Sequence, residues 1–194
     1  FRQAAVSSFA FVEAAGPFYA VKLLRDTIAM PSKAPTHEPA PRIDGGLSAE
    51  AKTVTAATVL RAMSMTTNHA RLVLLLGHGG HVTNNPHESA YHCGACAGQT
   101  GAVSARLLAQ LLNDPETRAG LPAHGVELPA DTVFLAGLHE TTTDKITLFH
   151  DCPTPSHAVD VAQAEVWLAG AGGLARSERA LRLPVVSSGT FEKR

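Results

Sequence analysis

The sequence carries almost no net charge. Its 194 residues include 16 Lys and Arg against 17 Asp and Glu, which gives a formal net charge of −1. Proteins that attract nucleic acid or anionic lipid show a basic patch or stripe. The charge balance therefore gives no indication of such a partner, and we expect no binding to nucleic acid.

Cysteine is also scarce. Three cysteines are too few and too unevenly placed for a disulfide scaffold. Two of them form the segment Cys93-Gly94-Ala95-Cys96, and in a reducing cytosol such a pair indicates metal binding or redox chemistry. The third, Cys152, lies between Asp151 and Pro153, and we expect it to be incidental.

A long uninterrupted hydrophobic run is missing. The most apolar stretch, 4–24, is broken by Glu13, Gly16, Pro17 and Lys22. A membrane-spanning helix needs about 20 predominantly apolar residues, so this stretch predicts a buried or interfacial helix. The chain starts with Phe1 rather than Met and stops without a terminating element, so we expect an internal fragment of a longer protein.

The apolar patterns predict an α/β fold. The apolar run 71–76 ends at Gly77 and predicts a central parallel strand, and further strands are expected at 132–138 and 145–149. Four prolines in 31–46 predict a loop. Helices are predicted over 4–30 with a kink or break at Pro17, over 47–67 with Ser48 as N-cap, over 102–112, from Asp114-Pro115 onward, and over 156–183 with an interruption near Gly170, Gly172 and Gly173.

The segment 77–101 carries the clearest chemical signal. His78 follows the first predicted strand, and ligands in open α/β sheets bind at the carboxyl ends of strands. Imidazole together with thiolate suits zinc, and the helix expected from Ala102 directs its positive end toward this segment. That end would lower the pKa of a cysteine and favour its thiolate, or hold an anion such as bicarbonate. Alternatives remain open: a hydrogen-bonded structural His78, a redox pair or two buried thiols, and polar loop roles for His81, His87 and His92.

Three stretches of the sequence resemble the DabA family. They are Ala5 to Glu13, Gly77 to Gly101 with Asn84-Asn85-Pro86-His87 and Cys93-Gly94-Ala95-Cys96, and Leu138 to Asp144. The resemblance implies a β-carbonic-anhydrase-like fold, a parallel sheet flanked by helices. We expect residues 1–194 to form part of one such zinc-binding α/β domain, which includes the Pro-rich loop at 31–46.

The same resemblance implies a Zn²⁺ centre with four protein ligands. Two come from an upstream Cys-x-Asp-x-Arg motif, which this chain lacks, and two from a His and a Cys fifteen positions apart, which His78 and Cys93 match. Cys96 is not a ligand in the family. This chain has His92 where the family favours an acidic residue, and it has His81 near the position where the family usually has a serine-like residue. These departures put the hydrogen bonds around the ligands in doubt.

The implied function is hydration of CO2 to bicarbonate within an energy-coupled inorganic carbon uptake system. The expected partner is a membrane-embedded, proton-channel-like subunit of the DabB type, with this subunit peripheral on the cytoplasmic face of the bacterial cell membrane. Activity is expected only from the full-length protein with that partner. Alternatives are a structural zinc or interaction module without catalysis, a thiol redox protein, and a hydrolase using His139 and Asp144, for which no nucleophile motif is present.

Overall fold

The computed structural model describes residues 16–17, 20–21, 24, 40–43, 45–82, 87–151 and 155–182. The chain divides into two compact units, Phe1–Pro39 and Ala40–Arg194. The described positions of the first unit are helical, as predicted, while the rest of the expected 4–30 helix and most of the 31–46 loop lie outside the described residues. Within the described part, no helix has the length and apolar character needed to cross a membrane. The interpretation of 1–194 as one domain stays a prediction.

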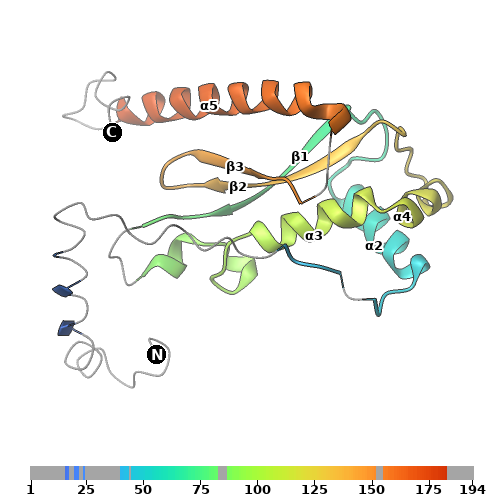
Figure 1. Cartoon of the computed structure of the whole chain (residues 1–194), viewed down its shortest axis with the longest axis horizontal. Helices are drawn as coiled ribbons and strands as arrows, with labels where there is room; N and C mark the ends of the chain where they lie inside the picture. Colours follow the sequence, from blue (N-terminus) through green and yellow to red (C-terminus); the bar gives the residue numbers. More distant parts are fainter. Residues whose placement is uncertain are drawn as a thin grey trace. The chain divides into compact units, whose positions relative to one another are not determined.

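The second unit is a layered α/β structure, as predicted. Figure 1 shows its sheet between α5 on one side and α3 on the other. The elements in chain order are α2 (Ala49–Ala62), β1 (Leu72–Gly79), the 3-10 turns η2 (Glu88–Tyr91) and η3 (Gly94–Cys96), α3 (Ala102–Asn113), α4 (Pro115–Gly120), η4 (Leu121–His124), β2 (Val133–Glu140), β3 (Lys145–Phe149), η5 (Pro155–His157) and α5 (Ala158–Ala180).

The sheet is mixed rather than all parallel, which corrects the prediction. Its order is β1-β2-β3, with β1 parallel to β2 and β2 antiparallel to β3. Only residues 141–144 join β2 to β3, and a parallel crossover needs about a dozen residues or more, so β3 must turn back. In the described sheet β1 lies at an edge, so its expected central position is also wrong.

The two faces of the sheet meet different helices. Leu75 and its register partner Ala136 belong to the hydrophobic core together with Ala105 and Ala109 of α3. Because successive residues of a strand face opposite sides of the sheet, Gly77 and Gly79 also face α3. His78 points to the opposite face, toward the α5 side.

Local capping signals are confirmed. The Ser48 hydroxyl accepts a hydrogen bond from the Ala51 amide at 3.2 Å, and Asp114 caps α4 through the Thr117 amide at 3.0 Å. The helix from Ser48 ends at Ala62, short of the predicted residue 67, because the chain leaves the helix through Met63 and Ser64, which has a φ of 57°.

The predicted break in the last helix is wrong. α5 continues through all three glycines. A Cβ on Gly172 would lie 2.8 Å from the carbonyl oxygen of Asp144, so glycine there permits a close contact with the β2–β3 turn and does not interrupt the helix.

Candidate metal centre at the carboxyl end of β1

His78 lies inside β1, one position before its end, rather than in the loop after it. Its side chain is exposed, and its register partner across the parallel pair is His139. The Gly101 amide donates a 2.8 Å hydrogen bond to the carbonyl oxygen of His78. This bond holds the start of α3 against the outer edge of β1 beside His78.

The segment between β1 and α3 folds back onto the end of the strand. The Cys93 amide donates to the carbonyl oxygen of Gln99 at 3.0 Å, which closes a small loop around η3. A Cβ on Gly79 would lie 2.9 Å from the Thr100 side chain and 3.4 Å from Nδ1 of His92. This segment therefore returns to the carboxyl end of β1.

Cys93 and Cys96 form an asymmetric thiol pair. A hydrogen bond from the Cys96 thiol lowers the pKa of Cys93, burial opposes this, and the backbone amides of Cys96 and Ala95 lower it further. The same thiol interaction raises the pKa of Cys96, whose sulfur also lies 4.0 Å from the Ser104 hydroxyl. Cys93 is therefore the member of the pair suited to act as a thiolate.

The other histidines of the segment differ from one another. His81 and His87 are exposed, and the backbone of His81 exchanges two hydrogen bonds with the Thr142 hydroxyl, at 3.0 and 2.9 Å. The ring atom Nδ1 of His92 is buried and has no hydrogen-bond partner in the structure. The sequence interpretation grouped His92 with the polar loop residues, and no local pattern distinguished it.

The described residues hold no complete metal site by themselves. Among them, no group of three or more His, Cys, Asp or Glu side chains could hold a metal ion. His78 and Cys93 both lie at the carboxyl end of β1, but strand alternation turns His78 away from the face on which Thr100 and His92 pack. Their pairing as ligands stays a prediction, and Cys152 lies outside the described residues.

A second titratable cluster lies on the α5 face. The carboxylate of Asp144 is 6% exposed, pairs with both terminal nitrogens of Arg179 and lies 3.3 Å from Nε2 of His139. Arg176 donates to the carbonyl oxygen of Thr143 at 3.1 Å. These contacts fasten α5 to the β2–β3 turn. The sequence suggested His139 and Asp144 for a hydrolase but could not show their arginine partner, which is 35 residues away.

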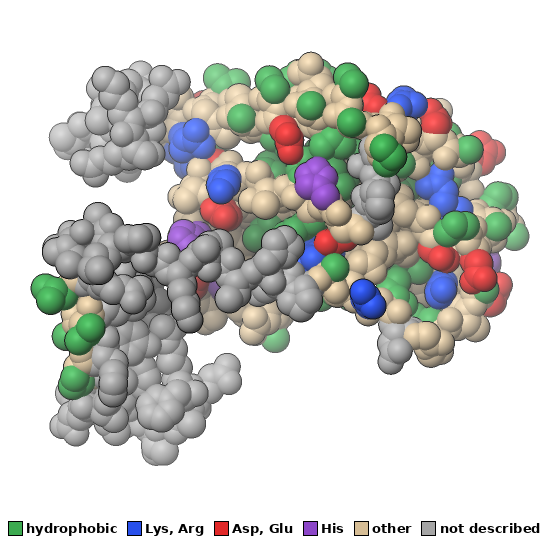
Figure 2. All heavy atoms as spheres, in the orientation of Figure 1, with side chains coloured by type: hydrophobic (Ala, Val, Ile, Leu, Met, Phe, Trp, Pro, Cys, Tyr) green, Lys and Arg blue, Asp and Glu red, His purple; other side chains and the backbone are tan. Residues whose placement is uncertain are grey.

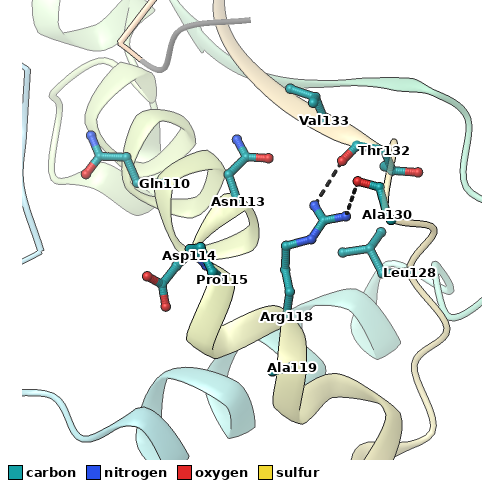
Figure 3. Close-up of a pocket in the computed structure, with 10 residues that line it drawn as sticks. All are labelled: Gln110, Asn113, Asp114, Pro115, Arg118, Ala119, Leu128, Ala130, Thr132 and Val133. Carbon is teal, nitrogen blue, oxygen red and sulfur yellow. Dashed lines mark hydrogen bonds between the residues drawn. The ribbon is translucent and has the colours of Figure 1, made fainter. Parts of the chain in front are cut away.

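An open pocket of about 810 Å³ lies at the amino end of β2, the opposite end from His78. Arg118 reaches from α4 into it, and its guanidinium donates to the carbonyl oxygens of Thr132 at 2.9 Å and Ala130 at 3.5 Å (Figure 3). Burial lowers the pKa of Arg118. Because this guanidinium is engaged by backbone carbonyls, it serves to hold α4 against the segment before β2.

The fold and this end of the sheet define a partial α/β domain that presents imidazole and thiol groups where a parallel strand meets a helix. The family model described as probable inorganic carbon transporter subunit DabA matches residues 1–194, and the chain belongs to this family.

Curated relatives agree with this membership. The chain is 60% identical over 185 residues to the probable inorganic carbon transporter subunit DabA of Xanthomonas axonopodis pv. citri (strain 306) and 60% identical over 185 residues to that of Methylobacterium sp. (strain 4-46). Each match covers 95% of this chain and 23% of the relative, so the chain spans about a quarter of their length. No solved structure matches the chain.

Proposed function

We propose that this chain is part of the zinc-binding subunit of an energy-coupled inorganic carbon uptake system, whose full-length form hydrates CO2 to bicarbonate. Family membership supports the role in inorganic carbon uptake. The observation that supports the zinc assignment is the return of the Cys93 and Cys96 thiols to the carboxyl end of β1 through the Cys93–Gln99 pairing, beside the imidazole of His78.

The donor types, imidazole and thiol, suit one half of a zinc site, and the His78 side chain would have to turn toward Cys93 when the metal binds. His78 and Cys93 would hold Zn²⁺ through nitrogen and sulfur, and the remaining ligands would come from the polypeptide outside this chain. When bound, zinc supplies a Lewis acid that acidifies water at neutral pH.

Two neighbouring features prepare the chain for this role. The hydrogen bond from the Cys96 thiol lowers the pKa of Cys93 and so favours its thiolate form. The bond from Gly101 to His78 brings the N-terminus of α3, which has no side-chain cap, beside the site. The amides of the first turn of α3 would favour a thiolate or a bicarbonate ion there.

The proposed partner is a membrane-embedded, proton-channel-like subunit of the DabB type. The description of the relatives as a transporter subunit supports a complex at a membrane. The subunit would then be peripheral on the cytoplasmic face, and coupling to the proton gradient would make net uptake directional.

Zinc content of the full-length protein tests the ligand assignment. His78→Ala and Cys93→Ala should each remove most of the bound zinc and abolish inorganic carbon uptake, while Cys96→Ala should retain zinc. Plasma mass spectrometry measures the metal, and circular dichroism confirms that the variants are folded. Loss of zinc in Cys96→Ala as complete as in Cys93→Ala would favour the structural zinc module instead.

The isolated chain provides a second test. It offers two of the four expected ligands, and ordering a loop costs about 1–2 kcal/mol per fixed residue. Zinc titration against a competing chelator should therefore show weak binding, with no CO2 hydration. A tight stoichiometric site in these 194 residues would contradict the carbonic-anhydrase-like proposal.

A further inference from the structure

α5 directs its large apolar side chains away from the sheet. Val161 and Ala164 pack inward and are buried. Five other apolar side chains are between 67% and 83% exposed. We call these residues the α5 stripe: Val159, Val166, Trp167, Leu174 and Leu181. Figure 2 shows hydrophobic side chains along the rim of the molecule that α5 forms.

The arc of the helix that carries the α5 stripe holds no charge. At 3.6 residues per turn, the stripe shares its arc with Gln163, Gly170, Gly173 and Ser177. The charged residues of α5 lie on its flanks or toward the sheet. A surface helix normally presents its charges outward, and monomeric proteins rarely expose a contiguous apolar patch above roughly a few hundred Å². The stripe therefore has the composition of a covered surface.

The α5 stripe also has a gap suited to a partner side chain. Gly170 lies between Trp167 and Leu174, and a Cβ built on it would meet nothing within 4 Å. Glycine weakens a helix interior relative to alanine. Gly172 is explained by its close contact with Asp144, whereas Gly170 has no such contact in the described structure. A large side chain from another helix would pack over Gly170 as a ridge fits a groove.

We propose that an apolar helix from the part of the full-length polypeptide outside this chain covers the α5 stripe. The chain spans 23% of its relatives, so roughly three quarters of the polypeptide can supply this helix at the high effective concentration of a linked segment. A membrane surface fits less well because lipid-binding helices have a basic polar face. α5 carries charges of both signs, and Arg179 is already paired with Asp144.

Thiol labelling of the full-length protein, purified without its membrane partner, tests this proposal. Trp167→Cys and Leu174→Cys should react with a maleimide about tenfold or more slowly than the control Glu165→Cys, an exposed position on another side of α5, because covered thiols react only during local opening. Peptide-resolved mass spectrometry distinguishes them from native cysteines. Equal rates would overturn the proposal. Protection that is lost on dilution would also overturn it, because that result indicates a second copy of the protein. Protection that appears only with the membrane partner or with vesicles would overturn it as well.

A matched pair of adjacent substitutions provides an independent readout. Gly170→Gln should lower the Tm of the full-length protein by several degrees because the new side chain occupies the gap, while Ala171→Gln, on the exposed flank, should leave it nearly unchanged. If the stripe were uncovered, Gly170→Gln would raise the Tm, since glutamine favours a helix more than glycine does. An unchanged or higher Tm would overturn the proposal. Neither experiment depends on zinc, so its failure is distinguishable from failure of the proposed function.

Discussion

Gly77 and Gly101 meet backbone to backbone where β1 passes the start of α3. A Cβ on Gly101 would lie 2.9 Å from the Cα of Gly77 and 2.9 Å from the backbone nitrogen of His78. Both positions therefore exclude any side chain. This contact sets how close the N-terminus of α3 lies to His78, so it connects the packing of the fold to the candidate metal centre.

Gly101→Ala should destabilise the protein by about 1–3 kcal/mol, since overpacking a tight contact forces the backbone apart. The comparison is Gly46→Ala, where a Cβ would meet nothing within 4 Å. Urea unfolding of the full-length protein measures both. A cost for Gly101→Ala no larger than that for Gly46→Ala would show that the β1–α3 contact is not tight.

Arg179→Ala should destabilise the protein by about 1–3 kcal/mol, because it leaves the buried carboxylate of Asp144 without its cationic partner. This cost is smaller than that of breaking a fully buried ion pair, because the Arg179 side chain is 53% exposed and solvent partly screens its charge. Chemical unfolding gives the value, with the exposed Arg182→Ala as control. Equal stability of the two variants would contradict the role of Arg179 in fastening α5.

Acid should weaken the cap of α4. Burial alone would raise the pKa of Asp114, but hydrogen bonds from the Thr117 amide and hydroxyl and the charge of Lys52 outweigh it and lower this pKa. A depressed carboxyl pKa stabilises the fold above the unfolded-state pKa, and this contribution disappears as the pH falls through the folded-state pKa.

Asp114→Ala should therefore cost about 1 kcal/mol near pH 7 and progressively less below about pH 4. Unfolding curves at several pH values measure the difference from the unsubstituted protein. Glu116→Ala, at a more exposed carboxylate near Lys52, serves as the control and should show little change. A difference for Asp114→Ala that stays constant into acid would contradict the assigned cap.

Cys93 should be alkylated faster than Cys96 in the metal-free full-length protein near pH 7. The lowered pKa of Cys93 gives it a larger thiolate fraction than Cys96, whose pKa is raised. Cys96→Ala should slow the reaction of Cys93 because it removes the stabilising thiol donor. Iodoacetamide labelling over pH 6–9 with mass spectrometry measures both rates. Faster labelling of Cys96 would reverse the assignment.

Local interactions made part of this structure predictable from sequence. Ser48 and Asp114 cap helices through amides three residues away, and the apolar run before Gly77 defines most of β1. The α/β class follows from the same short-range patterns. Family membership was also visible in sequence, because the stretch from Gly77 to Gly101 carries its motif along consecutive residues.

Only the tertiary structure decided how these elements meet. The return of β3 beside β2, the edge position of β1 and the pairing of His78 with His139 depend on register between distant segments. The pairing of Asp144 with Arg179 and the outward direction of Trp167 likewise depend on which side of α5 packs on the sheet. Periodicity within one segment reports its apolar residues but not which partner covers them. For that reason the sequence predicts that α5 is a helix, whereas only the folded structure shows that the α5 stripe faces away from the sheet.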